Sequence, residues 1–252
     1  MYSSYERSKG YQRFKKVFGG LLAKRPTFVY RNKPLSTDVP YIFLCNHGLN
    51  GSVSLFVNEI YFPHSHAPIG QQEIFRDFRT RFAYLYNFNH RLRRGLSKFQ
   101  SFLNATFEAT FTKMMYRLSK CIPSYKDHRS IKTFKMTFDC LDQGVSLMIY
   151  PENLEMGYNN IFISYVSGFV AIVKNYFKRS NKDIKVCALY YSKQTNQLIF
   201  DEPFSVVKML NDNKQKEEIA DFFVKRTNNL YIDFVQPKIK EAERKYKKKY
   251  KT

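Results

Sequence analysis

The sequence predicts a single α/β domain with a central, mostly parallel sheet flanked by helices. Three apolar runs of strand length carry this prediction, at residues 41–45, 145–150 and 184–191. Continuous apolar runs are typical of strands buried on both faces, and helix-like patterns separate these runs along the chain. A basic amphipathic segment at the N-terminus and a helix at the C-terminus complete the predicted architecture.

The N-terminal segment, residues 1–33, carries nine Lys and Arg against one acid, Glu6. Apolar residues recur there at a spacing of three to four, which predicts a basic amphipathic helix. Such a helix either packs on the rest of the domain or lies in a bilayer interface, and the sequence leaves both alternatives open.

The α/β domain is predicted to span residues 28–210. Helical patterns occupy about 70–120, 130–143 and 164–179, and shorter strand patterns lie at 27–30 and 197–200. The remaining segment, 211–252, is predicted to be a long helix followed by a basic tail. Pro237 marks an expected kink or break in that helix, because proline lacks the N–H that a helix interior needs.

The formal net charge of the 252-residue chain is +21, from 42 Lys and Arg against 21 Asp and Glu. Such an excess indicates an anionic partner: a nucleic acid, an acidic membrane surface or a phosphorylated substrate. Many of the cations lie between residues 76 and 135, interleaved with Phe and Tyr. No stretch approaches the roughly 18 apolar residues of a spanning helix, so we expect any membrane contact to be peripheral.

Cysteine and histidine usage argues against a disulfide framework and against a metal site. The four cysteines stand far apart and form no CxxC pair, and Cys45, Cys140 and Cys187 lie in runs that predict buried, reduced thiols of a cytosolic protein. His64 and His66 have metal-like spacing, but no nearby residue in the sequence completes a ligand set. There is no GxGxxG or P-loop motif, so we expect no nucleotide cofactor.

Polar residues follow two of the predicted buried strands. Asn46 and His47 come directly after residues 41–45, and Glu152 and Asn153 follow the run that ends at Tyr150. Neighbouring parallel strands place their carboxyl ends at one edge of the sheet, where open α/β sheets bind ligands. An imidazole there is suited to accept a proton from a hydroxyl near neutral pH, although a His that only packs is the alternative.

Four blocks in this order resemble the glycerolipid acyltransferase family, which includes the lysophosphatidic acid acyltransferases. Residues 46–52 resemble the family's Asn-His-x4-Asp motif, and 122–126 resemble its isoleucine-proline segment that ends in Arg. Residues 141–153 resemble the helix end, strand and Phe-Pro-Glu-Gly motif, and 186–191 resemble a later apolar strand. The resemblance covers roughly residues 28–205 and marks the chain as a divergent member.

The resemblance implies an enzyme that transfers a fatty acyl group from acyl-CoA or an acyl-carrier protein to the hydroxyl of a lysophospholipid or glycerol phosphate. His47 is then the general base, and Ser52 stands at the catalytic position of the motif's Asp. Lys126 would meet the acceptor phosphate, with Glu152 and Asn153 also binding the acceptor. No cofactor beyond the thioester co-substrate is implied, and the expected location is the cytoplasmic, inner face of the cell membrane, on an anionic lipid surface.

Departures from the family pattern keep two alternatives open. Ser52 supplies no negative charge to the imidazole, and loss of an orienting carboxylate can cost about 10⁴ in rate. Glu155 reverses the charge of a position that is basic in the family. The first alternative is a catalytically inactive lipid-binding relative. The second, which rests on the charge alone, is a basic nucleic-acid-binding protein. The acids that could replace the missing Asp are Asp139, Asp142 and Glu59.

Overall fold

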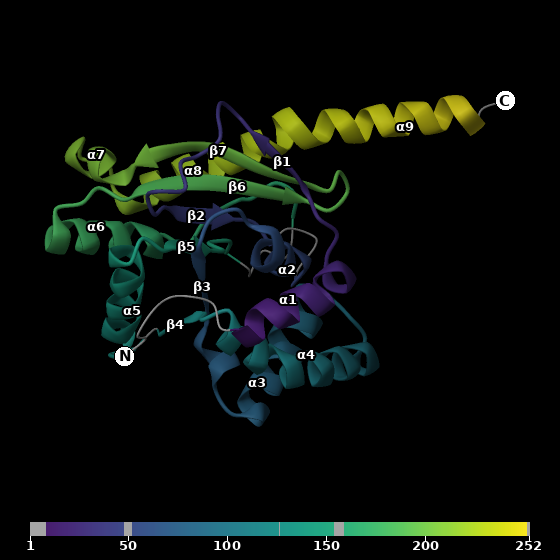
Figure 1. Cartoon of the computed structure of the whole chain (residues 1–252). Coiled ribbons are helices and arrows are strands. Elements are labelled where there is room, and N and C mark those ends of the chain that lie inside the picture. The colour runs from purple at the N-terminus through teal and green to yellow at the C-terminus, as the bar shows by residue number, and fades with distance from the viewer. Residues whose placement is uncertain (1–8, 48–51, 126, 154–158, 251–252) are drawn as a thin grey trace.

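The computed structural model describes residues 9–47, 52–125, 127–153 and 159–250, and in them a sheet lies between two sets of helices (Figure 1). The strands are β1 (Thr27–Tyr30), β2 (Ile42–Cys45), β3 (His66–Gln71), β4 (Ile122–Ser124), β5 (Ser146–Ile149), β6 (Lys185–Ser192) and β7 (Gln197–Ser205). Their order across the sheet is β1-β7-β6-β2-β5-β3-β4. Only β6 and β7 pair antiparallel among the described pairs. The predicted fold class, a mostly parallel α/β domain, is confirmed.

The helices flank this sheet, and the expected helices at both ends of the chain are present. They are α1 (Lys9–Leu22), α2 (Ser52–Tyr61), α3 (Phe78–Tyr84), α4 (Lys98–Leu118), α5 (Ser130–Asp142), α6 (Gly168–Ser180), α7 (Val206–Asn211), α8 (Lys216–Leu230) and α9 (Gln236–Tyr250). Three further helical segments are a 3₁₀ helix, η2 (Gln72–Phe75), and two π-helices, η3 (Leu85–Arg93) and η5 (Tyr231–Val235). The proposed segment boundaries at 1–33, 28–210 and 211–252 stay predictions.

Alternate residues of the central strands face different helix layers, as the pleat requires. In β2, Ile42 and Leu44 belong to the apolar cluster that includes residues of α5, α6 and α8, whereas Phe43 and Cys45 belong to the cluster on the α2 side. All four residues are fully buried. The continuous apolar pattern of this run is therefore explained by burial on both faces.

The N-terminal helix α1 packs against α2. The Tyr11 hydroxyl donates a hydrogen bond to the Glu59 carbonyl, and a Cβ added at Gly19 would lie only 3.1 Å from the Ile60 side chain. Of the two alternatives for this helix, packing on the domain is present in the structure. Exposed cations such as Lys16 remain on its outer side.

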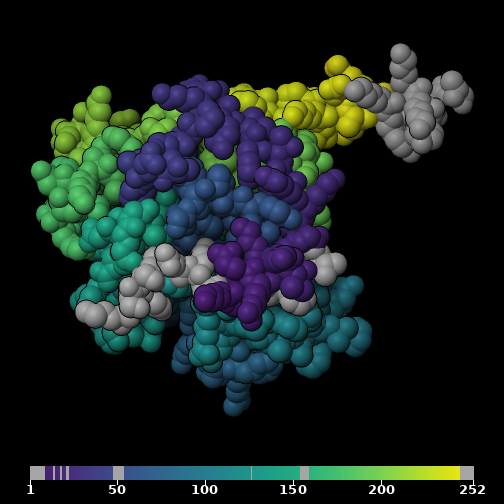
Figure 2. All heavy atoms as spheres, viewed as in Figure 1, coloured from purple at the N-terminus to yellow at the C-terminus, as the bar shows by residue number. Residues whose placement is uncertain are grey.

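Residues 72–118 form a helical excursion between β3 and β4, which we call the α3–α4 unit. It comprises η2, α3, η3 and α4, and it makes up the lower part of the molecule in Figures 1 and 2. Small side chains of α4, Ala105 and Ala109, pack against Leu85 of η3. Arg81 is buried and donates to backbone carbonyls of Ala109 and Arg76, which ties α3 to α4 and to the loop before it.

Two strands and one helix junction differ from the sequence-based expectation. β3 and β4 were missed because Pro68 and Pro123 lower the strand signal of their segments. At the C-terminus, Pro237 lies in the first turn of α9, where a missing N–H is tolerated, and the wider turn η5 precedes it. The expected break is thus a change of helix type just before the proline, and α9 extends away from the body (Figure 1).

The four cysteines, Cys45, Cys121, Cys140 and Cys187, are buried thiols outside any disulfide, as expected for the three in apolar runs. Within the part of the chain that the structure describes, no helix combines the length and apolar character needed to cross a bilayer.

Candidate functional site

The site lies where two neighbouring parallel strands end. β2 pairs with β5 in register, with Leu44 opposite Ile149, so the segments that follow them leave the sheet side by side. The His47 backbone N–H donates to the Glu152 carboxylate at 2.5 Å, and the His47 Nδ1 atom lies 4.0 Å from Glu152 Oε2. The expected convergence of these two residues at one edge of the sheet is present.

Asn46 fixes the backbone from which His47 projects. Its side-chain Nδ2 donates to the Tyr191 carbonyl at 3.0 Å, and its Oδ1 accepts from the Tyr191 backbone N–H at 2.6 Å. The amide therefore continues the β2–β6 hydrogen-bond ladder one step past the strand. Asn46 is fully buried, so a residue that left these backbone groups unpaired would carry a desolvation cost of about 1–3 kcal/mol.

Aromatic packing orients the imidazole. The Tyr150 ring centroid lies 4.4 Å from that of His47 at an interplanar angle of 44°. Asn58 of α2 donates to the Tyr150 hydroxyl at 2.9 Å and lies 3.2 Å from the Cys45 sulfur. Tyr150 is thus held by α2 and in turn limits the rotation of His47.

The electrostatic environment keeps His47 neutral at physiological pH. Burial, together with the positive charges of Arg93 and Arg94, lowers the pKa of His47 to about 3. Its side chain is only 17% exposed and that of Glu152 only 4% exposed. A neutral imidazole has a ring nitrogen available to accept a proton, although its lowered pKa makes it a weak base without further stabilisation of the charged form.

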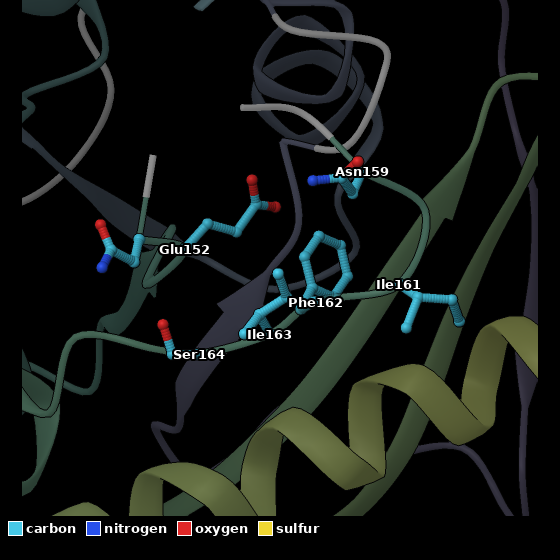
Figure 3. Close-up of a pocket in the computed structure, with 7 residues that line it drawn as sticks. Glu152, Asn159, Ile161, Phe162, Ile163 and Ser164 are labelled. Carbon is cyan, nitrogen blue, oxygen red and sulfur yellow. The ribbon is translucent and has the colours of Figure 1, made fainter. Parts of the chain in front are cut away.

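Glu152 also lines a small pocket, shown in Figure 3. The pocket is formed by Glu152, Asn153, Asn159, Ile161, Phe162, Ile163 and Ser164. In Figure 3 the carboxylate of Glu152 and the amide of Asn159 point toward each other across it. Backbone pairing between Asn153 N–H and the Ser164 carbonyl, at 3.3 Å, holds the two sides of the pocket together.

The structure brings together three of the five predicted site residues. His47, Glu152 and Asn153 lie in one region, with Asn153 half-buried beside Glu152. Ser52 is the first residue of α2, but its side chain is outside the described part of the chain, as is the whole of Lys126.

The three acids considered as replacements for the missing Asp have other settings. Glu59 lies 3.3 Å from His66 Nε2, and Asp142 binds Arg179 at 2.6 Å. Asp139 is exposed on α5. The carboxylate that lies beside His47 is instead that of Glu152, which the sequence had placed in acceptor binding.

The pair formed by His66 and Glu59 corrects the expectation that no carboxylate accompanies the two histidines. His66 Nδ1 in addition contacts the His64 carbonyl at 3.1 Å, so the ring is held from both nitrogens. Among the described residues, no group of three or more His, Cys, Asp and Glu side chains is arranged to bind a metal.

Sequence reasoning missed the residues that surround the imidazole. Asn58 and Tyr150 carried no motif signal of their own, because their roles depend on how α2 packs on the sheet. Arg93 and Arg94 were counted within a basic stretch but not singled out. The available signal was their position in the tight cluster Arg91–Arg94, which follows the aromatic run of η3.

The fold and this site define an α/β protein with a His–Glu pair at the carboxyl edge of its sheet. No model of a known protein family matches the sequence, and none of the curated proteins is similar to it. Among solved structures, it is similar to the 1-acyl-sn-glycerophosphate (LPA) acyltransferase PlsC from Thermotoga maritima. The TM-score is 0.44 and the identity 13%, over 86% of this chain and 78% of that one.

Proposed function

We propose that the chain is an acyltransferase that moves a fatty acyl group from a thioester donor to the hydroxyl of a phosphorylated lipid acceptor. The observation that carries the proposal is the pairing of His47 with Glu152 at the carboxyl edge of the sheet. The motif resemblance of residues 46–52 and 141–153 supports the same assignment, as does the excess of cations for a phosphorylated substrate. The proposed donors are acyl-CoA or acyl-carrier protein, and the proposed acceptors are a lysophospholipid or glycerol phosphate.

In the proposed reaction, His47 accepts the proton of the acceptor hydroxyl as its oxygen attacks the thioester carbonyl. The carbon–sulfur bond then breaks, and the thiolate leaves and takes up the proton from the imidazolium. Glu152 acts on this step through His47: its carboxylate, 4.0 Å from Nδ1, stabilises the imidazolium as it forms. Glu152 would thereby supply the charge that Ser52 cannot.

We assign acceptor-phosphate binding to Arg93 and Arg94, together with Lys126. The charges of the two arginines already act on His47, and a guanidinium can bind a phosphate with two parallel hydrogen bonds. A bound phosphate would offset these charges and so raise the pKa of His47. The acceptor would in this way help to activate its own base.

A second candidate function, lipid binding without catalysis, is favoured by a specific observation. The pKa of His47 is lowered to about 3, and the motif position of the family's Asp is Ser52. A base with so low a pKa transfers protons poorly unless the substrate changes its surroundings. Both candidates use the same cationic surface and are proposed to act at the inner face of the cell membrane.

The test is acyl transfer from radiolabelled acyl-CoA or acyl-carrier protein to lysophosphatidic acid and glycerol 3-phosphate. We expect transfer by the native chain and a loss of at least about 10³-fold in His47→Ala, because the base is removed. Transfer that persists unchanged in His47→Ala would contradict the assignment. A third variant, Ser52→Asp, separates the two candidates, because activity that arises only in this variant identifies the native chain as the non-catalytic relative.

A further inference from the structure

The helix α4 exposes a continuous stripe of large apolar side chains. Its members are Phe99, Leu103, Phe107, Phe111 and Met114, and each is between 45% and 71% exposed. Their spacing of four, four, four and three places them on one face of the helix. At 1.5 Å per residue, the stripe from Phe99 to Met114 extends over about 22 Å of the 21-residue helix. We call it the α4 stripe.

Packing within the α3–α4 unit fixes the direction in which the α4 stripe faces. The buried residues of α4 are small: Ser101, Ala105 and Ala109. They lie on the opposite side of the helix and pack toward η3, where Leu85 joins them in a small apolar cluster. The helix is therefore arranged with small residues inward and large residues outward, the reverse of a helix that uses its large residues for the core.

Cations accompany the α4 stripe. Exposed Lys98 and Arg117 lie at the two ends of the helix. Between residues 76 and 118 there are nine Lys and Arg against two acids, Asp77 and Glu108, which gives a local net charge of 9 − 2 = +7. Cations near an anionic lipid surface strengthen the binding of a protein to it.

We propose that the α4 stripe inserts into the surface of a bilayer that contains anionic lipids, with the helix lying in the plane of the membrane. Binding of a helix at a bilayer surface increases with the apolar area that it buries and with the attraction of its cations to anionic lipids, and α4 with its flanking cations offers both. A binding site for single-stranded nucleic acid combines cations with the aromatic rings on which bases stack. No Lys or Arg lies between Lys98 and Lys113, the stretch that holds most of the α4 stripe. The charge and the apolar area thus both point to lipid.

This docking has a consequence that rests on the proposed function. The α3–α4 unit also carries Arg93 and Arg94, whose charges act on His47. Insertion of α4 would therefore hold the site against the bilayer, where a lipid acceptor resides. The binding itself does not depend on catalysis, and His47→Ala is expected to bind vesicles as well as the native chain.

The chain has no Trp, so a single introduced Trp reports on one surface position. We compare Phe107→Trp on the α4 stripe with Ile131→Trp on α5, because both parent residues are exposed, at 66% and 73%. With vesicles of phosphatidylcholine and phosphatidylglycerol, we expect a blue shift and quenching by brominated acyl chains at position 107 but not at 131. Absence of both signals at 107, or equal signals at the two positions, would overturn the proposal.

Sedimentation with the same vesicles measures the affinity. The double variant Phe107→Ser/Phe111→Ser is expected to bind about tenfold more weakly, or more, since a loss of about 1.4 kcal/mol is one factor of ten. The matched control, Ile131→Ser/Ile232→Ser, removes two exposed apolar residues elsewhere and is expected to change binding less than about twofold. Equal losses in the two double variants, or loss of RNA binding in the first with vesicle binding intact, would contradict a lipid-binding stripe.

Discussion

Among the residues that the structure describes, two acidic side chains, those of Asp201 and Glu152, are almost completely removed from solvent, and they have different partners. Asp201 of β7 has no exposed side-chain surface and pairs with Arg226 at 2.5 Å and with Arg31 at 3.1 Å. Glu152, which follows β5, is 4% exposed and contacts the backbone N–H and the ring of His47. One acid faces side chains with fixed charge, and the other faces a ring whose charge can change.

This difference separates a structural role from a chemical one. A guanidinium stays protonated, and the hydrogen bond from Arg226 to Asp201 raises the pKa of Arg226 further. The cluster joins the residue after β1 to β7 and α8. The imidazole of His47 is neutral, so the Glu152 carboxylate is placed beside a group that gains interaction energy only when it takes a proton.

The largest expected effect is on the rate of acyl transfer, when the negative charge of Glu152 is removed. Glu152→Gln keeps an oxygen that can accept from the His47 N–H but removes the negative charge, so we expect acyl transfer to fall by about 10²- to 10⁴-fold. The acid limb of the pH–rate profile should also move to lower pH, because an amide does not stabilise the imidazolium. A merely structural role for Glu152 would leave the position of that limb unchanged.

The matched control for this variant is Glu202→Gln, which changes a half-exposed carboxylate of β7 that binds Arg226. We expect its transfer rate to stay within about twofold of the native rate, since rim ion pairs contribute little. Similar losses of rate in Glu152→Gln and Glu202→Gln would show that the effect of the first substitution is not specific to the site.

At Asp201, the same kind of substitution is expected to affect folding. Asp201→Asn leaves Arg31 and Arg226 without their shared buried carboxylate, which should lower the free energy of unfolding by about 3–5 kcal/mol. Urea denaturation followed by circular dichroism measures this change. A loss below about 1 kcal/mol would mean that the two arginines find other partners and that the cluster is not a structural one.

The sequence was informative where burial alone decides the structure. The run at 41–45 is apolar throughout and the run at 145–150 is apolar apart from Ser146, which predicts β2 and β5. Polar residues directly after two parallel strands predict where His47 and Glu152 meet. β3 and β4 were not predicted, because Pro68 and Pro123 are compatible with strands only through the particular pairing that tertiary structure provides. The fold class was therefore predictable from periodicity, whereas β3 and β4, at one edge of the sheet, were not.

The assignment of roles was less predictable than the location of the site. The sequence resemblance placed Glu152 in acceptor binding and sought the missing acid at Asp139, Asp142 or Glu59. The strand pattern placed Glu152 at the same edge of the sheet as His47, but the contact between its carboxylate and the imidazole depends on the direction of the backbone after each strand, which the sequence does not give. His90 shows the same limit: its basic neighbours in the sequence predict a surface residue, but it is fully buried, with its Nε2 atom 3.3 Å from the Glu108 carboxylate.

The smallest expected effect is on stability at low pH, and it tests the neutral state of His47 without any substrate. The pKa of His47 is about 3 in the folded chain and about 6.5 when unfolded, so below pH 6.5 only the unfolded chain takes up this proton. The free energy of unfolding should therefore fall by up to about 1.4 kcal/mol per pH unit as the pH drops from about 6.5 toward 3, and be unaffected above that range.

His47→Gln cannot titrate and should lose this part of the dependence. Groups that face the ring in the described part of the chain include Arg93, Arg94, Tyr150 and Glu152, and Glu152→Gln, which keeps the imidazole, should retain the His47 slope. Parallel stability curves for the native chain and His47→Gln between pH 6.5 and 4.5 would show that the imidazole is charged in the folded chain, and Glu152 would then be an ion-pair partner like Asp201.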